Sequence, residues 1–394
     1  MKPLEGLKVL DLSRVLAGPF ATMILGDLGA EIIKIEIPGV GDDSRSFGPF
    51  IKNESAYFMS INRNKKSITL NLKKKEGIEI LKKLVEKCDV LVENFRPGTM
   101  EKLGIGYDEL KKINPRIIYA ACSGFGHTGP YSQRPAYDVI VQGMGGIMSI
   151  TGQPGGPPTR VGASIGDITA ALFLVIGILA ALNVREKTGL GQKIDVAMLD
   201  CQVAILENAI ARYFVTGKSP QPIGNRHPSI TPFSSFKTKD GFVIIAVGND
   251  NLWAKFCNVV GRSELIDDER FRTNPDRTKN WEELEPILNE IFSEKTTDEW
   301  LEILEKAGIP CGPINNIERI VNDPQVRARE MLVELEHPVA GKMKVPGIPI
   351  KFSETPGKVE SPAPLLGQHT KEVLKEMLGF TEEQIETLRA NEAI

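Results

Sequence analysis

The sequence predicts an α/β protein in which a doubly wound parallel sheet of the Rossmann type is joined to a smaller α+β domain. Over residues 7–121, short apolar runs typical of buried strands alternate with segments of helical periodicity. Strands that alternate with helices form parallel sheets, so these segments favour one such sheet. Near residue 218 the chain becomes polar and rich in proline, and a hairpin pattern follows, which predicts the second domain.

The strands of the large domain are expected at residues 7–12, 31–36, 89–93 and 117–121. A turn at residues 17–19 precedes the first helix, and the expected helices cover residues 20–28, 76–88 and 107–113. Residues 139–160 are rich in Gly and Pro and predict a loop, either a mobile lid or a surface connection. Ligands of such sheets bind beyond the carboxyl ends of the strands, which here means residues 13–19, 37–45, 94–102 and 122–138.

The rest of the chain is expected to leave the large domain and return to it. Residues 1–217 form the first part of the large domain, residues 218–330 the small domain with its linker, and residues 331–394 the part that returns. The small domain is predicted to contain a hairpin around residues 239–241 and two amphipathic helices, at residues 281–292 and 297–307.

Composition excludes several classes of protein. The chain has 394 residues, a net charge of −3, 41% hydrophobic and 25% charged residues, as in a soluble globular protein. It shows no basic face or tail, so no nucleic-acid partner is expected. There is no signal-peptide pattern, and the apolar run at residues 170–182 is too short to cross a membrane, so we expect a cytoplasmic protein without a membrane partner. The five scattered cysteines predict free thiols and no metal site.

The most informative segment is residues 162–167 (GASIGD), directly before that apolar run. Asp167 therefore lies at the start of a buried helix, behind small residues that allow close approach. A helix N-terminus favours the anionic carboxylate, and such a carboxylate in a pocket of small residues can act as a nucleophile. The alternative is that Asp167 merely caps the helix, as aspartate commonly does.

Other motifs narrow the chemistry. No G-x-G-x-x-G follows the first strand and no P-loop occurs, which argues against a dinucleotide cradle and a nucleotidase. At the end of a strand, Asn94 can hydrogen-bond a ligand edge and Phe95 can stack on a base, while Arg96 and Lys102 can meet phosphates. An ordinary β-to-α turn is the alternative. The basic residues at 63–66 and 73–75 are either a solvated face or part of a nucleotide diphosphate site.

Histidines and further acidic residues give weaker signals. His127 lies in a loop without an obvious Ser or Cys partner, and no G-x-S-x-G occurs, so a Ser-His-Asp triad is not expected. Tyr137 and Asp138 open a helical stretch, where Asp138 can serve as another cap. Arg226 and His227, in a polar cluster at residues 224–230, are either contacts for a substrate carboxylate or linker residues.

Read together, these segments resemble the family III CoA-transferases, the group that contains formyl-CoA transferase and carnitine CoA-transferase. The likeness covers nearly the whole chain and rests on separate motifs in the right order: LAGP at 16–19, GAEIIKIE at 29–36, NKKSITL at 64–70, VENFRPG at 92–98, GD at 166–167, TGLGQ at 188–192, GIPCGP at 308–313 and PLLGQHT at 364–370. The resemblance implies transfer of coenzyme A from an acyl-CoA to a carboxylic acid. It also implies an interlocked, ring-shaped homodimer and no permanently bound cofactor.

The resemblance assigns roles to individual residues. The nucleophile of the family falls on Asp167. Contacts to the adenine and pantetheine of CoA fall on Val15, Ala17, Leu70, Lys73, Asn94, Phe95 and Lys102, and Tyr137 and Asp138 fall around the thioester. Possible substrate contacts are Leu16, Arg226, His227 and Gly248. The donors for the oxyanion are expected either among residues 143–156 or at residue 248.

Departures from the family pattern bear on the substrate. Leu16 stands where formyl-CoA transferase has glutamine, and Ile37 stands where it has arginine. Its long glycine-rich loop is absent, and residues 247–250 occupy a comparable place. These differences argue against oxalate and formate, whereas residues 224–230 look more like relatives that handle dicarboxylic acids such as succinate.

Two alternative functions remain open from the sequence. The same superfamily contains α-methylacyl-CoA racemases, whose catalytic histidine corresponds to Tyr137 here. A neutral tyrosine is a poor base for an α-proton, which favours the transferase. The other alternative is a non-catalytic CoA-binding protein.

Overall fold

The computed structural model describes all 394 residues and divides them into two compact units. The larger unit comprises residues 1–147, 161–211 and 324–394, and the smaller unit residues 148–160 and 212–323. The principal difference from the expected division is that residues 148–160 group with the smaller unit.

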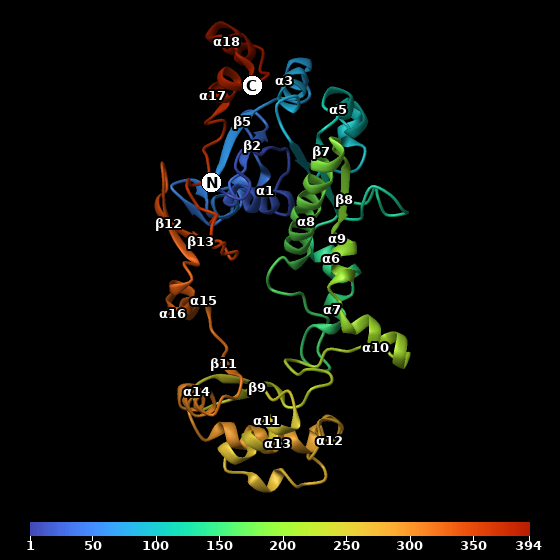
Figure 1. Ribbon diagram of the computed structural model, residues 1–394, viewed down its shortest axis with the longest axis vertical. Helices are drawn as coiled ribbons and strands as arrows, with labels where there is room; N and C mark the ends of the chain where they lie inside the picture. The colour runs from blue at the N-terminus through green and yellow to red at the C-terminus, as the bar shows by residue number, and fades with distance from the viewer. The chain divides into compact units, whose positions relative to one another are not determined.

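The larger unit is built on a six-stranded sheet in which every pair of neighbours is parallel (Figure 1). In spatial order the strands are β5 (Lys65–Thr69), β2 (Glu31–Glu36), β1 (Lys8–Asp11), β6 (Val90–Glu93), β7 (Ile118–Ser123) and β8 (Lys193–Ala197). Counted along the chain within this sheet, the order is 3-2-1-4-5-6, that of doubly wound dinucleotide-binding folds. The predicted fold class is therefore confirmed.

This order creates a switch point between β1 and β6. From β1 the chain winds outward through β2 to β5, then crosses back to β6 and winds the other way. Asp11 of β1 is in register with Val92 of β6, so the two strands end side by side. The connections after these strands diverge to opposite faces, which leaves a crevice at their carboxyl ends.

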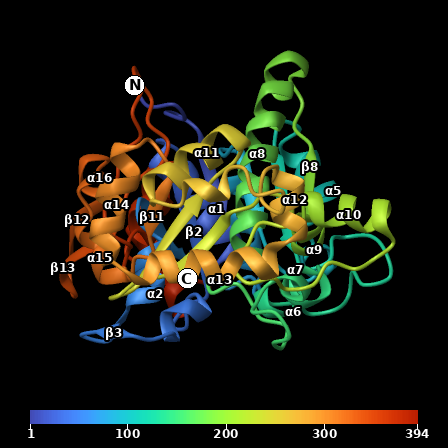
Figure 2. The same ribbon diagram turned by 90° about the horizontal axis from the view of Figure 1, so that it is seen from below.

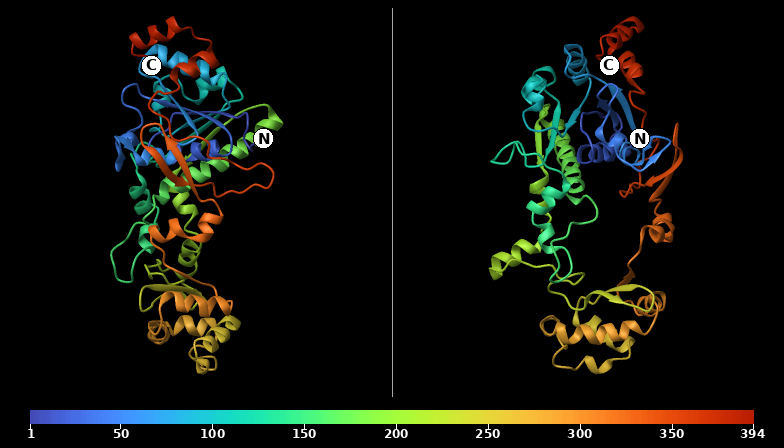
Figure 3. Two further views of the ribbon diagram at one scale, coloured as in Figure 1. Left: turned by 90° about the vertical axis from the view of Figure 1, so that its left-hand side faces the viewer. Right: turned by 180° about the vertical axis from the view of Figure 1, so that it is seen from behind.

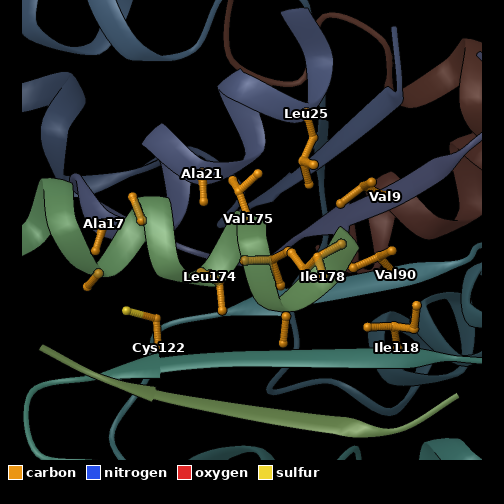
Figure 4. Close-up of a cluster of buried hydrophobic side chains, with 14 of the residues drawn as sticks. Val9, Ala17, Ala21, Leu25, Val90, Ile118, Cys122, Leu174, Val175 and Ile178 are labelled. Carbon is orange, nitrogen blue, oxygen red and sulfur yellow. The ribbon is translucent and has the colours of Figure 1, made fainter. Parts of the chain in front are cut away.

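Side chains of the strands alternate between two apolar layers. On one face, Val9, Val90 and Ile118 pack against α1 (Ala17–Asp27) and α8 (Ile165–Thr188), as Figure 4 shows. On the other face, alternate residues such as Leu10 and Leu91 pack against α3 (Lys75–Val85), α5 (Tyr107–Ile113), α17 (Thr370–Leu378) and α18 (Glu382–Ala390). The two C-terminal helices lie beside α3, far from it in sequence (Figure 3).

Shorter elements connect these layers. They are η1 (Asp43–Ser46), β3 (Phe50–Ile51), β4 (Glu54–Ser55), α2 (Ala56–Ile61), α4 (Thr99–Lys102), α6 (Asp138–Met144), α7 (Ile147–Ile150), α9 (Met198–Ala204), α10 (Asn208–Thr216), α16 (Pro324–Ala328), β12 (Leu332–His337) and β13 (Gly341–Pro346). The loop expected over residues 139–160 was wrong for its first half, which forms α6 and α7. The turn expected at residues 17–19 is the first turn of α1, where Pro19 is tolerated because its missing N–H would have no helical partner.

Helix α8 is longer than the apolar run predicted. Its 24 residues are long and apolar enough to cross a membrane by length and composition alone, which corrects the expectation from residues 170–182. One side of α8 packs against α1 and β7 inside the unit. Another side exposes large apolar residues, namely Leu172, Phe173, Ile176 and Leu179.

The smaller unit has its own sheet and core. Its antiparallel sheet has the order β11 (Cys311–Pro313), β10 (Phe242–Ala246), β9 (Phe233–Lys237), and β9 and β10 form the predicted hairpin. The helices are α11 (Asp250–Val259), η2 (Ser263–Leu265), α12 (Asn274–Lys279), α13 (Trp281–Ser293), α14 (Thr297–Lys306) and α15 (Ile317–Asn322). Helices α11 and α13 lie on one side of the sheet (Figures 1 and 2), over an aromatic core in which Phe236 stacks on Phe292 at 5.0 Å.

Candidate active site

Two cavities lie at the switch point of the larger unit. The first, here called the aspartate cavity, has a volume of about 280 Å³ and is lined by Val15, Leu16, Ala17, Asn94, Phe95, Arg96, Ser123, Arg134, Tyr137 and Asp167 among others. The second, the apolar cavity, has about 390 Å³ and is lined by Leu12, Ile35, Ile37, Asp42, Leu70, Lys73, Phe95 and Leu103 among others. Arg14 and Phe95 contribute to both, so the cavities are neighbours.

Most of the residues assigned by resemblance come together here. Seven of them line the aspartate cavity and two more line the apolar cavity, although they come from distant parts of the chain. Lys102, on α4, is exposed and lines neither cavity. Ile37, which replaces an arginine of formyl-CoA transferase, lies on the wall of the apolar cavity.

Asp167 is the third residue of α8 and faces the aspartate cavity. The helix begins after Ser164, and the start of the helix has no side-chain capping bond, so the interpretation of Asp167 as a mere cap is wrong. Gly166 lets α8 approach α6 closely. A Cβ atom at Gly166 would lie 2.7 Å from Val141 Cγ2 and 3.0 Å from Asp138 Oδ1. The small residue before Asp167 therefore has a definite packing role.

The electrostatic setting of Asp167 differs from the sequence expectation. Burial raises the pKa of Asp167 to about 7, and the charge of nearby Asp138 raises it further in the same direction. No hydrogen bond or cation contributes an opposing effect. The helix N-terminus was expected to favour the anion, but desolvation outweighs it here because the carboxylate is half-buried and receives no donor. A carboxylate that is poorly solvated and unpaired is a reactive one.

Asp138 is buried behind this position and fixes the start of α8. Its Oδ1 accepts a hydrogen bond from the backbone N–H of Gly166 at 2.8 Å, and its Oδ2 accepts one from Nε2 of Gln142 at 2.8 Å. The side chain belongs to α6, so it ties the two helices together. It is a direct neighbour of the cavity residue Tyr137, the N-cap of α6.

The loop after β1 is held by residues from other segments. Asn94 Oδ1 accepts from the N–H of Arg14 at 2.8 Å, and Asn94 Nδ2 donates to the carbonyl of Arg14 at 2.7 Å. Both ends of this amide are therefore engaged by backbone, and the contact of Asn94 with a ligand edge stays a prediction for its remaining N–H and lone pair. Val15 has φ of 66°, a left-handed conformation that a β-branched residue rarely adopts.

The basic cluster at residues 63–66 is structural. Arg63 pairs with Asp27 at 2.7 Å and Lys65 with Asp11 at 3.0 Å, all four being buried. Lys66 pairs with two glutamates on the surface. The hypothesis that these cations bind a nucleotide diphosphate is therefore wrong, because their charges are already neutralised. Lys73, in the second cluster, does line the apolar cavity.

Several residues near the cavities carried no sequence signal. Tyr57 of α2 is one: burial raises its pKa to about 12, and the charges of Asp167 and then Asp42 add to the effect. Arg134 lies over the ring of Tyr131 at 4.0 Å. Both come from segments without a motif, and only the fold brings them to Asp167.

His127 also has partners that the sequence did not reveal. Nδ1 lies 3.0 Å from Lys193 Nζ, and its backbone N–H donates to Asp195. Because an ammonium group only donates, Nδ1 is the acceptor and the proton lies on Nε2, 3.8 Å from Glu93. Burial raises the pKa of Glu93 to about 7. This cluster lies behind Phe95, whose N–H donates to Glu93 at 2.7 Å.

The remaining assigned residues belong to the smaller unit. The guanidinium of Arg226 lies over the ring of Trp281 at 5.3 Å, and Nδ1 of His227 accepts from the N–H of Ser229 at 3.2 Å. Gly248 has open space where a Cβ atom would be. Their role as substrate contacts stays a prediction.

Comparison with known proteins gives a consistent result. Residues 4–370 match the model of CoA-transferase family III. Succinyl-CoA:glutarate CoA-transferase of Mus musculus is 47% identical over 389 residues, which cover 98% of this chain and 89% of that protein. Acetyl-CoA:oxalate CoA-transferase of Acetobacter aceti is 47% identical and covers 95% of each chain. The crystal structure of a CAIB/BAIF family protein from Brucella suis is 42% identical with a TM-score of 0.86, covering 95% of this chain and 99% of the other.

Proposed function

Because this chain belongs to CoA-transferase family III, we propose that Asp167 is the nucleophile with which it moves coenzyme A from an acyl-CoA donor to a carboxylic acid acceptor. The CoA-transferase activity itself follows from the family and from relatives at 42–47% identity. Those relatives are transferases, which favours transfer over racemisation and over CoA binding without catalysis. The covalent role of Asp167 rests on the geometry of the aspartate cavity.

One observation carries the assignment to Asp167. Two carboxylates line the cavity, Asp43 and Asp167. Asp43 pairs with Arg14 at 3.1 Å on the surface, so its charge is satisfied. Asp167 is half-buried, and nothing that touches it lowers its pKa. A desolvated and unpaired carboxylate at the edge of a cavity is the better nucleophile of the two.

The proposed reaction proceeds in four balanced steps. An oxygen of Asp167 attacks the thioester carbonyl of the donor, the C–S bond breaks, and an aspartyl anhydride and the CoA thiolate result. The thiolate attacks the aspartyl carbonyl and expels the donor acid, which leaves an aspartyl-CoA thioester. The acceptor carboxylate attacks that thioester, the C–S bond breaks, and a second anhydride and the CoA thiolate result. The thiolate then attacks its acyl carbonyl, which releases the new acyl-CoA and restores Asp167.

This sequence of steps needs no resident cofactor, because each step exchanges one activated acyl bond for another. Backbone N–H donors are required for the oxyanion in every step. Cytoplasmic location is part of the proposal and is supported by five free cysteines without a disulfide.

For the acceptor we propose a small dicarboxylate. Relatives named for succinate and glutarate, from Mus musculus and Agrobacterium fabrum, are 47% and 42% identical. Leu16 is one of the departures that argue against oxalate, yet a relative named for oxalate is 47% identical. Oxalate therefore stays among the candidates beside succinate and glutarate. A panel of these acids with succinyl-CoA and acetyl-CoA as donors distinguishes them.

The decisive experiment is to trap the intermediate. The enzyme is incubated with acyl-CoA, quenched with hydroxylamine or borohydride, and digested for mass spectrometry. The modification is expected on Asp167. Asp167→Ala should lower turnover by about 10³-fold or more while CoA binding persists, since the other cavity residues remain.

The matched control is Asp43→Ala, which removes the other carboxylate of the cavity and should still give the adduct. A label on any other residue refutes the assignment to Asp167. Deuterium exchange at the α-carbon without an acceptor acid indicates a racemase instead. Tight CoA binding with neither adduct nor exchange indicates a binding protein.

A further inference from the structure

The loop between β1 and α1 contains a strained residue that forms part of the aspartate cavity. Val15 has φ of 66°, although its branched Cβ disfavours the left-handed region. Such a conformation persists only where surrounding groups hold it. Val15 and its neighbours Leu16 and Ala17 line the cavity that contains Asp167. The groups that hold Val15 therefore help to set the shape of the cavity.

Asp42 provides the hydrogen bond on Val15 itself. Its Oδ1 accepts from the N–H of Val15 at 3.1 Å, and also from the N–H and the hydroxyl of Ser44 at 2.9 and 2.7 Å. One residue earlier, the Asn94 amide holds both backbone groups of Arg14. The carbonyl of Arg14 and the N–H of Val15 belong to one peptide group, so Asn94 and Asp42 hold its two ends.

Asp42 is itself fixed by buried charges. Its Oδ2 pairs with Lys34 Nζ at 2.8 Å, and both side chains are almost inaccessible to water, at 1% and 0% exposed. Lys34 Nζ also donates to the carbonyl of Ser13 at 2.9 Å. The backbone N–H of Asp42 donates to Glu36 at 3.0 Å. The same lysine therefore holds Asp42 and the beginning of the loop that Asp42 restrains.

From this arrangement we propose that Asp42 is a positioning residue for CoA transfer: with Asn94, it holds Val15 in the left-handed conformation and so fixes the wall of the aspartate cavity. Asp42 also lines the apolar cavity, so one carboxylate defines a boundary shared by both cavities. The inference rests on the proposed role of Asp167. It requires no contact of Asp42 with the reacting atoms.

The positioning role predicts a specific loss. In Asp42→Ala the N–H of Val15 loses its acceptor, and Val15 relaxes toward ordinary backbone angles. The cavity wall then moves relative to Asp167, and misplacement of about 1 Å costs roughly 100-fold in rate. We expect kcat to fall about 10- to 100-fold, with a smaller change in KM for acyl-CoA. Asp42→Asn keeps an oxygen acceptor for Val15 and should recover part of kcat.

A second substitution tests the route through backbone conformation. Glycine adopts positive φ without strain, so in Val15→Gly the loop depends less on the hydrogen bonds with Asp42 and Asn94. The fold decrease in kcat caused by Asp42→Ala should therefore be at least five times smaller in the Val15→Gly background than in the parent. Asn94→Ala, which leaves no buried lysine unpaired, should show the same dependence on residue 15. It provides the test even if the Asp42 variants do not fold.

The control is Asp27→Ala, which breaks a similarly buried ion pair with Arg63 away from the cavities. It should lower the melting temperature as much as Asp42→Ala does, yet keep kcat within about twofold. The proposal is overturned if Asp42→Ala or Asn94→Ala folds and keeps the kcat of the parent. It is also overturned if either substitution lowers kcat by the same factor in the parent and in the Val15→Gly background. Adduct formation on Asp167 in the parent enzyme is measured in parallel. If the adduct is absent, the assignment of Asp167 as nucleophile is refuted, while the positioning role of Asp42 is still tested by the kcat values of the variants.

Discussion

At the scale of single residues, the chemistry depends on the contrast between Asp138 and Asp167. These two aspartates are far apart in sequence, but Asp138 is hydrogen-bonded to Gly166, the residue directly before Asp167. Asp138 is buried and hydrogen-bonded at both oxygens, whereas Asp167 has no such partner and a pKa raised to about 7. Part of that rise comes from the negative charge of Asp138. The structural carboxylate therefore tunes the one proposed to react.

This contrast predicts a pH dependence. Only the anion of Asp167 attacks a thioester, so kcat/KM for acyl-CoA should fall as the pH decreases through about 7. Asp138→Asn removes the neighbouring charge, which lowers the pKa of Asp167 and should move this fall to lower pH, by about one pH unit. The measurement is the pH profile of kcat/KM between pH 5 and pH 9 in about ten steps.

The control for this variant is its stability. An asparagine at 138 presents an NH₂ to Gln142 or Gly166, both donors, so thermal unfolding should show a loss of about 1–3 kcal/mol. A profile that stays in place, or that moves to higher pH, contradicts the coupling between the two aspartates.

The role of a residue was predictable only where the sequence directly around it forms a recognisable pattern. Asp167 stood out because small residues and an apolar run surround it in the sequence. Asp42 and Lys34 did not, because their meaning comes from Val15 and Ser13, which only the parallel sheet brings close. The bonds between the Asn94 amide and Arg14 were not predictable, because Arg14 lies 80 residues earlier in the chain.

At the scale of elements, the close approach of α6 and α8 positions Asp167. Gly166→Ala should separate these helices, since the new methyl group would overlap Val141 and crowd Asp138. We expect a loss of about 1–3 kcal/mol in stability and a marked decrease in kcat. Gly162→Ala is the matched control, because its Cβ atom would meet nothing within 4 Å. Equal effects of the two substitutions on thermal unfolding and turnover would contradict the packing argument.

The elements that sequence reasoning missed share a physical feature. Strands β5 (KKSIT) and β8 (KIDVA) are interrupted by charged residues, so they lack the continuous apolar run that marks a buried strand. Lys65 of β5 is buried only because Asp11 neutralises it. The start of helix α6 at Asp138 was expected, but its remaining residues were expected as loop, because Gly143 and the glycines that follow masked the apolar residues at 139–141.

At the scale of the whole molecule, the alternation of strands and helices predicted the parallel doubly wound sheet, but it did not predict the exposed apolar residues of α8. Repeated βαβ units imply a parallel doubly wound sheet, and the six-stranded sheet has that order. The sequence pattern alone gave no reason to expect five large apolar residues exposed on α8. Exposed apolar side chains gathered on one helix are typical of an interaction site.

We propose that a second copy of the chain covers this face, as in the interlocked homodimer that the family resemblance implies. The polar and charged ends of α8, with Asp167 near one end and Arg185 buried near the other, fit a packed protein interface better than a lipid bilayer. Ile176→Glu would place a carboxylate in the middle of the covered face, where burial of an unpaired charge is costly. The variant should therefore lose the dimer, or lower its affinity by about 100-fold or more, in size-exclusion chromatography with light scattering. Lys187→Glu, an exposed change on the same helix, should leave the dimer intact. A parent protein that is monomeric, or that floats with phospholipid vesicles, would contradict the proposal.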